Sequence, residues 1–327
     1  MKMPIRIWLS IGLLASTLAV HAQERPVGLP GNYPSKPIHV VIATNPGGGL
    51  DIVGRGVLSR VGERWGAPFV FDNRSGVNVA LDLVARSAPD GYTLLISAGS
   101  LFFQADQLQK VAYDVRKKFA PVAGLTSSPF VLAVNNNMPV SNLAEFIAYT
   151  KAHPNSVNYA YVSGGSDSQL AGELLKLQTG IDMQGIAYKG VGPAYIEQMA
   201  GRIHLTFGTT ASSMPQIKAG NIKPIAVTSR QRSKVLPNIP SINETLPTFD
   251  NFSGWVAVFA AEGTPAPIVN ALNKEINAVL GSAEVQKFFA QDGSEVIPGP
   301  PEQLRDLLAT SLETSRRVMK QANIKYE

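Results

Sequence analysis

Hydrophobic positions along this chain follow two periods in turn. Short apolar runs, such as 38–43 and 157–162, are typical of buried β-strands. Between such runs lie stretches in which apolar residues recur every three or four positions. In residues 51–65 every fourth residue from Val53 onward is apolar, so one helix face would be buried. The alternation predicts an α/β protein.

The same patterns predict most of the remaining elements. Further strands are expected at 69–71, 92–97, 131–134, 181–188, 203–207 and 222–228. Further helices are expected at 79–87, from Asn142 toward 152, at 170–177 before Gly180, and over most of 267–320. Strands that alternate with helices indicate parallel sheets covered on both faces, and 327 residues suffice for two such lobes. Ligands of such sheets bind beyond the carboxyl ends of the strands.

The first residues have the pattern of an export signal. Lys2 and Arg6 precede an apolar stretch at 7–20, and small residues surround a cleavage site after Ala22. The chain has no cysteine, which excludes a lipoprotein anchor and disulfides. We therefore expect 1–22 to be a signal peptide and the mature protein to be periplasmic.

Composition excludes several classes of function. The net charge is +5 without a block of Lys or Arg, so no nucleic-acid partner is expected. His39, His153 and His204 are scattered and there is no cysteine, so neither a metal site nor a cofactor is expected.

A glycine-rich segment, "TNPGGGLDIV" at 44–53, follows the first predicted strand and precedes a helix. Glycines let backbone N–H groups approach a ligand, and the positive end of the helix points to the same place. The segment therefore predicts an anion site, with a tight turn as the alternative. Asp51 is interpreted as the N-cap of the helix.

A second segment, "YVSGGSDSQL" at 161–170, places hydroxyl groups between a strand and a helix. Hydroxyl and N–H groups there suit a carboxylate, whereas capping by Ser166 or Asp167 alone is the alternative. The segment also nearly matches the nucleophile elbow of hydrolases, with Ser166 as nucleophile and Ser168 in place of the last glycine. The scattered histidines make a catalytic triad a weak hypothesis.

Several motifs together resemble one family. "YPSKPIHVVIATNPGGGLDIVGR", "NRSG", "APDGYTLL", "SGGSDSQLAGELL", "AYKGVGPA" and "EGTPAPIV" resemble the tripartite tricarboxylate transporter substrate-binding receptors, the Bug-type periplasmic proteins. The resemblance implies a type II periplasmic binding protein fold, with two lobes, a hinge and an interlobe ligand cleft. It also implies a receptor, not an enzyme, that captures an organic acid for membrane transporter subunits.

The resemblance also implies the ligand-binding residues. Carried onto this chain, they are Thr44, Asn45, Gly47, Gly48, Gly49, Ala98, Gly99, Ser163, Gly165, Ser166, Ser168, Tyr188 and Thr209. The chain departs from the family pattern at Leu50, Gly208 and Tyr161. These departures favour an organic acid with an apolar, aromatic body. Whether Tyr161 and Lys189 face the cleft is left open.

The helical tail needs a sheet to cover, which predicts lobes that are discontinuous in sequence. We expect lobe one to comprise 36–128 plus 255–327 and lobe two to comprise 129–254. The protein is expected to be a monomer. A serine hydrolase that uses Ser166 and a ligand-sensing docking protein are the alternative functions.

Overall fold

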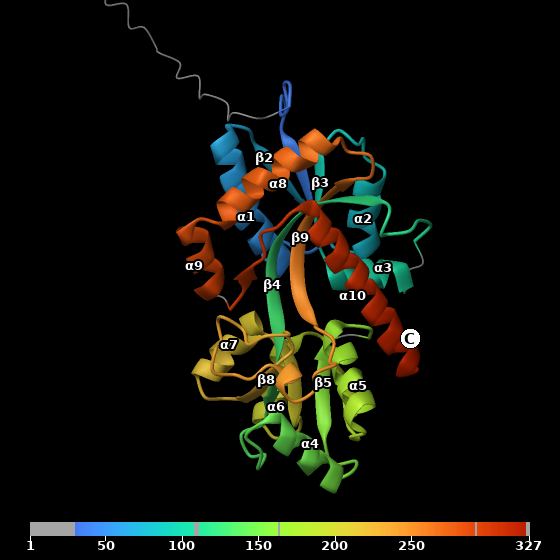
Figure 1. Ribbon diagram of the computed structural model, residues 1–327, viewed down its shortest axis with the longest axis vertical. Coiled ribbons are helices and arrows are strands. Elements are labelled where there is room, and N and C mark those ends of the chain that lie inside the picture. Colours follow the sequence, from blue (N-terminus) through green and yellow to red (C-terminus); the bar gives the residue numbers. More distant parts are fainter. Residues whose placement is uncertain (1–29, 108–110, 163, 292, 325–327) are drawn as a thin grey trace, which may run out of the picture.

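The computed structural model describes residues 30–107, 111–162, 164–291 and 293–324, which form two α/β lobes, one above the other in Figure 1. The predicted signal peptide lies outside these residues. The first lobe contains three parallel strands, β1 (Ile38–Ile42), β2 (Phe69–Asn73) and β3 (Thr93–Ala98). The second lobe contains three more, β5 (Asn158–Val162), β6 (Gln184–Tyr188) and β7 (Leu205–Thr209).

Two long strands, β4 (Phe119–Val134) and β9 (Ser253–Ala261), run through both lobes (Figure 1). β4 pairs with β9 as far as Pro129, and then with β7 and β8 (Lys223–Val227) over 130–134. All these pairs are antiparallel, as is the pair of β3 with β9. The expectation of wholly parallel sheets is wrong for these strands because a chain that crosses between lobes runs against its neighbours.

The helices of the first lobe cover both faces of its sheet. One face packs against α1 (Gly49–Trp65), α8 (Ala266–Leu280) and α9 (Ala283–Gln291). The other packs against α2 (Val77–Ala85), α3 (Gly99–Gln107) and α10 (Pro301–Gln321). Adjacent residues of β1 point to opposite faces. Val40 and Ile42 are buried on the face covered by α1, α8 and α9, and Val41 is buried on the face covered by α2, α3 and α10.

In the second lobe the described residues form the α-helices α4 (Leu143–Ala152), α5 (Asp167–Thr179), α6 (Val191–Met199) and α7 (Thr210–Lys218). The short elements are the 3₁₀ helix η1 (Ile242–Glu244) and β10 (Glu295–Val296), which pairs with β4. α10 extends past the first lobe and contacts α5 (Figure 1). One apolar cluster therefore includes Leu170 of α5 and Leu308 of α10.

The predicted strands and helices all occur, with ends that differ by a few residues, apart from β4. The side chain of Asn142 accepts a hydrogen bond from the N–H of Glu145, and Gly180 ends α5 at φ 68°, as predicted. β4 is far longer than the predicted 131–134. The part before residue 131 contains Pro121, Gly124 and Pro129 and two irregularities in its register, which hide the period-two pattern. Within the described part of the chain, no helix is long and apolar enough to cross a membrane.

Candidate functional site

The glycine-rich segment forms the turn from β1 into α1. Gly48, not Asp51, is the N-cap of α1, so the N-cap interpretation of Asp51 is wrong. The helix begins two residues earlier than predicted because Gly47 adopts φ 78°, a conformation that glycine tolerates. Asp51 instead accepts a hydrogen bond at 2.9 Å from the N–H of Gly47.

The Asp51 carboxylate is buried and holds this segment in place. Arg55 Nε donates to it at 2.6 Å and Asn73 Nδ2 at 3.0 Å. Burial alone would raise the pKa of Asp51, but the hydrogen bonds from Gly47, Asn73 and Arg55 outweigh burial and lower it. Asn73 also donates to the carbonyl of Thr44 at 3.3 Å, so both sides of the turn are tied to one network.

The turn has fewer free donors than its three glycines suggest. The N–H of Gly47 binds Asp51, and the N–H of Gly48 binds the carbonyl of Asn45 at 3.1 Å. The N–H of Gly49 has no partner among the described residues and lies at the positive end of α1. The anion site expected here is thus reduced to the first turn of the helix.

The serine-rich segment joins β5 to α5. Ser166 is the N-cap, and its hydroxyl accepts a hydrogen bond from the N–H of Gln169 at 3.4 Å. Ser168 Oγ lies 3.0 Å from Ser166 Oγ and accepts from the N–H of Val162 at 3.1 Å. Ser166 therefore caps the helix, and Asp167 is the first residue of the helix. Both hydroxyls still face a cavity.

A third helix start lies at the end of β7. Thr209 caps α7, and its hydroxyl accepts from the N–H of Ser212 at 3.3 Å. A side chain at the preceding Gly208 would place its Cβ 1.9 Å from the hydroxyl of Tyr195. That buried hydroxyl hydrogen-bonds Ser213 at 2.7 Å. The chain departs from the family pattern at Gly208 because Tyr195 occupies the space that a side chain at position 208 would need.

A cavity of about 380 Å³, here called the cleft cavity, lies where the starts of α5 and α7 meet the two crossing strands. Its lining comprises Ser100, Gln104, Phe130, Val162, Ser166, Asp167, Ser168, Val191, Phe207, Gly208, Thr209, Ser212 and Gly254. Ser100 and Gln104 belong to α3 of the first lobe. The cavity is therefore bounded by both lobes.

Among the described residues of the predicted site, three line this cavity, namely Ser166, Ser168 and Thr209. The residues that do not line it are Thr44, Asn45, Gly47, Gly48, Gly49, Ala98, Gly165 and Tyr188, and Gly99 lines a second cavity. Ser163 lies outside the described residues. Sequence reasoning missed Ser100 and Gln104 because α3 was not predicted, and Phe130 because the proline before it hid the strand.

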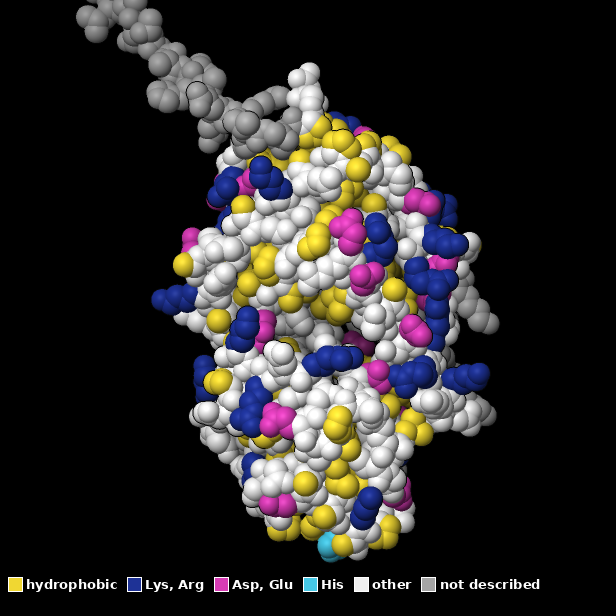
Figure 2. Space-filling model, viewed as in Figure 1, with side chains coloured by type: hydrophobic (Ala, Val, Ile, Leu, Met, Phe, Trp, Pro, Cys, Tyr) yellow, Lys and Arg dark blue, Asp and Glu magenta, His cyan; other side chains and the backbone are white. Residues whose placement is uncertain are grey.

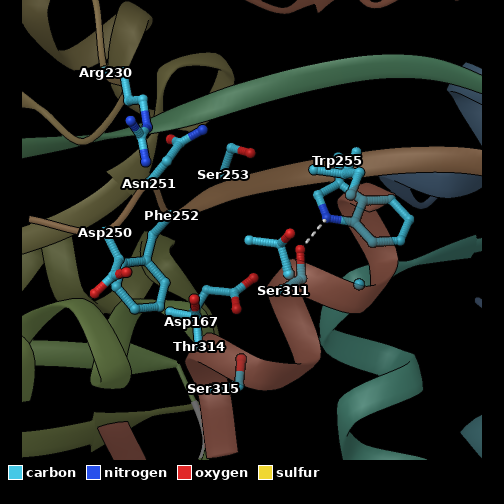
Figure 3. A pocket seen from close by; sticks show the side chains of 13 residues that line it. Asp167, Arg230, Asp250, Asn251, Phe252, Ser253, Trp255, Ser311, Thr314 and Ser315 are labelled. Carbon is cyan, nitrogen blue, oxygen red and sulfur yellow. Dashed lines mark hydrogen bonds between the residues drawn. The ribbon is translucent and has the colours of Figure 1, made fainter. Parts of the chain in front are cut away.

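The second cavity, here called the hinge-side cavity, measures about 160 Å³ and lies between β9, α10 and the start of α5 (Figure 3). Its lining comprises Gly99, Asp167, Arg230, Asp250, Asn251, Phe252, Ser253, Trp255, Leu307, Thr310, Ser311, Thr314 and Ser315. Trp255 Nε1 donates to Ser311 Oγ at 3.1 Å and joins β9 to α10. Figure 2 shows a hollow at this height, between the lobes, with basic side chains at its rim.

Asp167 lines both cavities. Figure 3 shows its carboxylate in the hinge-side cavity, between the ring of Phe252 and Ser311. No described residue forms a hydrogen bond or an ion pair with this carboxylate. Burial raises the pKa of Asp167 to about 7.

The remaining residues of interest lie away from the cleft cavity. Tyr161 is partly buried against the apolar core, with its ring 6.0 Å from that of Tyr159. Leu50 packs against both apolar clusters of the first lobe. Tyr188 packs near Ala160, and Lys189 is exposed.

The hydrolase alternative finds no support in the surroundings of Ser166. Its hydroxyl contacts Ser168 and the N–H of Gln169, and no histidine lines the cavity in the described part of the chain. His204 Nδ1 accepts from the N–H of Asn158, and His153 stacks on Tyr149. The described residues contain no cluster of His, Asp and Glu that could hold a metal ion.

Comparison with known proteins gives one consistent family. The family model described as tripartite tricarboxylate transporter family receptor matches residues 53–324. Protein BugT of Bordetella pertussis is 32% identical over 327 residues, which cover 98% of this chain and 99% of BugT.

Solved structures agree with this match. An R. palustris protein solved with adipate is 32% identical at a TM-score of 0.75, over 90% of this chain and 100% of that chain. MatC from Rhodopseudomonas palustris, solved with bound malate, is 28% identical at a TM-score of 0.70, over 88% of this chain and 99% of MatC. The structural likeness supports the type II fold with two lobes and an interlobe cleft.

Proposed function

The chain belongs to the tripartite tricarboxylate transporter receptor family, and we propose that it binds an organic carboxylate in the cleft cavity for delivery to the membrane subunits of such a transporter. It is a solute-binding receptor of the periplasmic type and not an enzyme. One observation carries the proposed site: uncharged hydroxyl groups meet at the amino ends of α5 and α7, in a cavity bounded by both lobes.

This arrangement suits a carboxylate without a basic partner. Ser166, Ser168, Thr209 and Ser212 supply hydroxyl groups, and the helix ends add partial positive charge. Hydroxyl and N–H donors avoid the desolvation of a buried ion pair. We place one carboxylate of the ligand at Ser166 and Ser168.

The first lobe would complete the site when the lobes close. We propose that Thr44, Asn45, Gly47, Gly48, Gly49, Ala98 and Gly99 of the first lobe then approach the ligand, with Ser163, Gly165 and Tyr188 of the second lobe as further predicted contacts. Support comes from the position of the glycine-rich turn at the carboxyl end of β1 and at the free start of α1. The lobes of this movement are 36–128 plus 255–327 and 129–254, in line with the switch of β4 from β9 to β7 after Pro129.

The ligand that we propose is a dicarboxylate with an apolar body. Phe130, Val162, Val191 and Phe207 give the cleft cavity an apolar wall, where burial contributes about 25 cal/mol per Å². The solved relatives hold adipate and malate. An aromatic body remains our sequence-based preference, although Tyr161 does not line the cavity and so adds nothing to it.

Calorimetry and thermal unfolding against adipate, terephthalate, benzoate, citrate and glutamate test this proposal. Adipate or terephthalate at about 100 times its Kd should raise the free energy of unfolding by about 2.7 kcal/mol. Tight binding of citrate or glutamate, with no response to adipate or to either aromatic acid, would contradict the proposed ligand class.

We further propose that the protein is exported with cleavage after Ala22 and acts as a monomer without nucleic acid. The basic start and the apolar stretch at 7–20 support export, and the lack of a Lys or Arg block argues against nucleic acid. The mass of the protein recovered from the periplasm tests export and the cleavage site, and its sedimentation in solution tests whether it is a monomer.

A further inference from the structure

Three consecutive residues at the start of α5 bring a carboxylate next to the proposed anion site. Ser166 and Ser168 place their hydroxyls 3.0 Å apart at the cleft cavity, while Asp167 between them lines both cavities. Because consecutive Cα atoms are about 3.8 Å apart and the Ser and Asp side chains add a few ångströms each, an anion on the two hydroxyls lies within roughly 12 Å of the Asp167 carboxylate. Two carboxylates would then share one helix end.

No charged side chain of the described residues forms an ion pair with Asp167. Asp167 is the only charged residue among the described residues that line the cleft cavity, and Gln104 from α3 is neutral. The groups that face it from α10, at Thr310, Ser311, Thr314 and Ser315, are neutral hydroxyls.

The two other charged residues of the hinge-side cavity do not neutralise Asp167. Asp250 pairs with Arg317 of α10 at 2.5 Å, and Arg230 is exposed. Arg316, also on α10, pairs with Asp106 of α3. Asp167 therefore meets a bound anion without an ion-pair partner among the described residues, and the positive groups near it are the exposed Arg230 and the start of α5.

We propose that Asp167 takes up a proton when the receptor binds a dicarboxylate, so that the complex is more stable with the Asp167 carboxyl group neutral than with it ionised. The inference rests on the proposed function. A like charge at this spacing raises a carboxyl pKa by about one to two units at an effective dielectric constant near 20. The neutral carboxyl group then no longer repels the ligand.

The sign of the effect follows from linkage. Burial already raises the pKa of Asp167 to about 7 in the free protein, and the bound anion raises it further. Below pH 7 both states carry the proton and affinity is independent of this group. Above pH 7 the free protein loses the proton first, so affinity falls until the pKa of the complex is passed.

Adipate is the probe, because both its carboxyl groups resemble that of Glu, with a pKa of about 4.3, and stay ionised above pH 6. Binding of adipate to the wild-type protein should weaken by roughly tenfold or more from pH 6.5 to pH 9. Calorimetry near pH 8 in two buffers of different ionisation enthalpy should show uptake of about 0.5–1 proton per adipate.

Asp167→Asn keeps the shape and removes the titrating group. This variant should bind adipate at every pH about as tightly as the wild type does at pH 6.5, with no proton uptake. Asp182→Asn, at an exposed position of the second lobe, removes the same charge and should retain the wild-type pH dependence.

Equal affinity of the wild type at both pH values, or an unchanged slope in Asp167→Asn, would overturn the inference. Loss of adipate binding in Asp167→Asn would also overturn it, since the ionised carboxylate would then be required. If adipate does not bind the wild type at pH 6.5, terephthalate replaces it as the probe, and if neither binds, the proposed ligand class fails and this inference with it. Tight, pH-independent binding of adipate leaves the proposed function intact and removes only the inference.

Discussion

Asp51 connects the glycine-rich turn to α1 through a side chain that is 6% exposed. It accepts from the N–H of Gly47, from Arg55 and from Asn73. Asp51→Asn replaces a charged acceptor by an amide whose two N–H donors find only donor groups among these hydrogen-bond partners. We expect a loss of about 1–3 kcal/mol in the free energy of unfolding at pH 7, measured by urea denaturation.

The same substitution should change the response to acid. Because the pKa of Asp51 is lowered in the folded state, its contribution is complete above the unfolded pKa of about 3.9 and is lost as the pH falls through the lower folded value. Wild type and Asp51→Asn should therefore converge in stability below pH 4. A constant difference between them from pH 7 to pH 2 would contradict this assignment.

Gly208 is packed against the hydroxyl of Tyr195, which would lie 1.9 Å from an added Cβ. Gly208→Ala should lower the free energy of unfolding by about 1–3 kcal/mol through overpacking. In a Tyr195→Phe background the same change should be less harmful, because the clashing atom is gone. A double-mutant cycle measures this coupling, and strictly additive effects would disprove the contact.

Ser166 combines a structural role with the proposed ligand contact. Both Asp and Asn are good N-cap residues, so Ser166→Asp and Ser166→Asn should each preserve α5. Only Ser166→Asp adds a negative charge at the bound carboxylate, and it should nearly abolish ligand-induced stabilisation in thermal unfolding. If Ser166→Asp keeps the full ligand-induced shift while the protein remains folded, the carboxylate binds elsewhere.

Single-residue roles were the hardest to predict from the sequence. The hydroxyls of Ser166, Ser168 and Thr209 were recognised because they stand at helix starts. The N-cap of α1 was predicted about one turn too late, at Asp51. The backbone conformation of Gly47 decides where the helix begins, and the hydrophobic pattern contains no information about it. Gly208 of β7 packs against Tyr195 of α6, and that packing cannot be predicted from the local sequence.

At the scale of elements, α10 joins the two lobes. Its residue Leu312 is fully buried in the apolar cluster that also contains Leu170 and Leu174 of α5. Leu312→Ala should lower the free energy of unfolding by about 2–5 kcal/mol, measured by denaturant titration. The neighbouring Glu313 is exposed, so Glu313→Ala is the matched control and should change stability by less than about 0.5 kcal/mol.

Elements with a clear hydrophobic period were predicted, and those without one were not. β1 and α1 have side chains buried in regular patterns, which the sequence displays. α3 follows β3 without a loop, and its first residue is Gly99, a residue type that is typical of turns, so the helix was not predicted. An added Cβ at Gly99 would lie 2.6 Å from Trp255, so the glycine serves a contact with a distant strand.

For the whole molecule, the proposed function requires closure of the lobes. The chain has no cysteine, so two introduced cysteines can carry labels without interference. Lys151→Cys and Lys274→Cys lie on exposed positions of α4 and α8, in different lobes. A saturating ligand of the proposed class should shorten the distance between labels, measured by energy transfer. An unchanged distance in a variant that binds normally would exclude closure.

The order of strands also bears on how the chain folds during synthesis. β3 lies in the first lobe between β1 and β9, and Leu94 pairs with Ala260. The first three strands therefore leave the ribosome long before the partner that completes their sheet. Such long-range pairing slows folding, because loop closure must precede the contacts that reward it. A nascent chain must keep the open edge of β3 from aggregating until β9, at Ser253–Ala261, has been made.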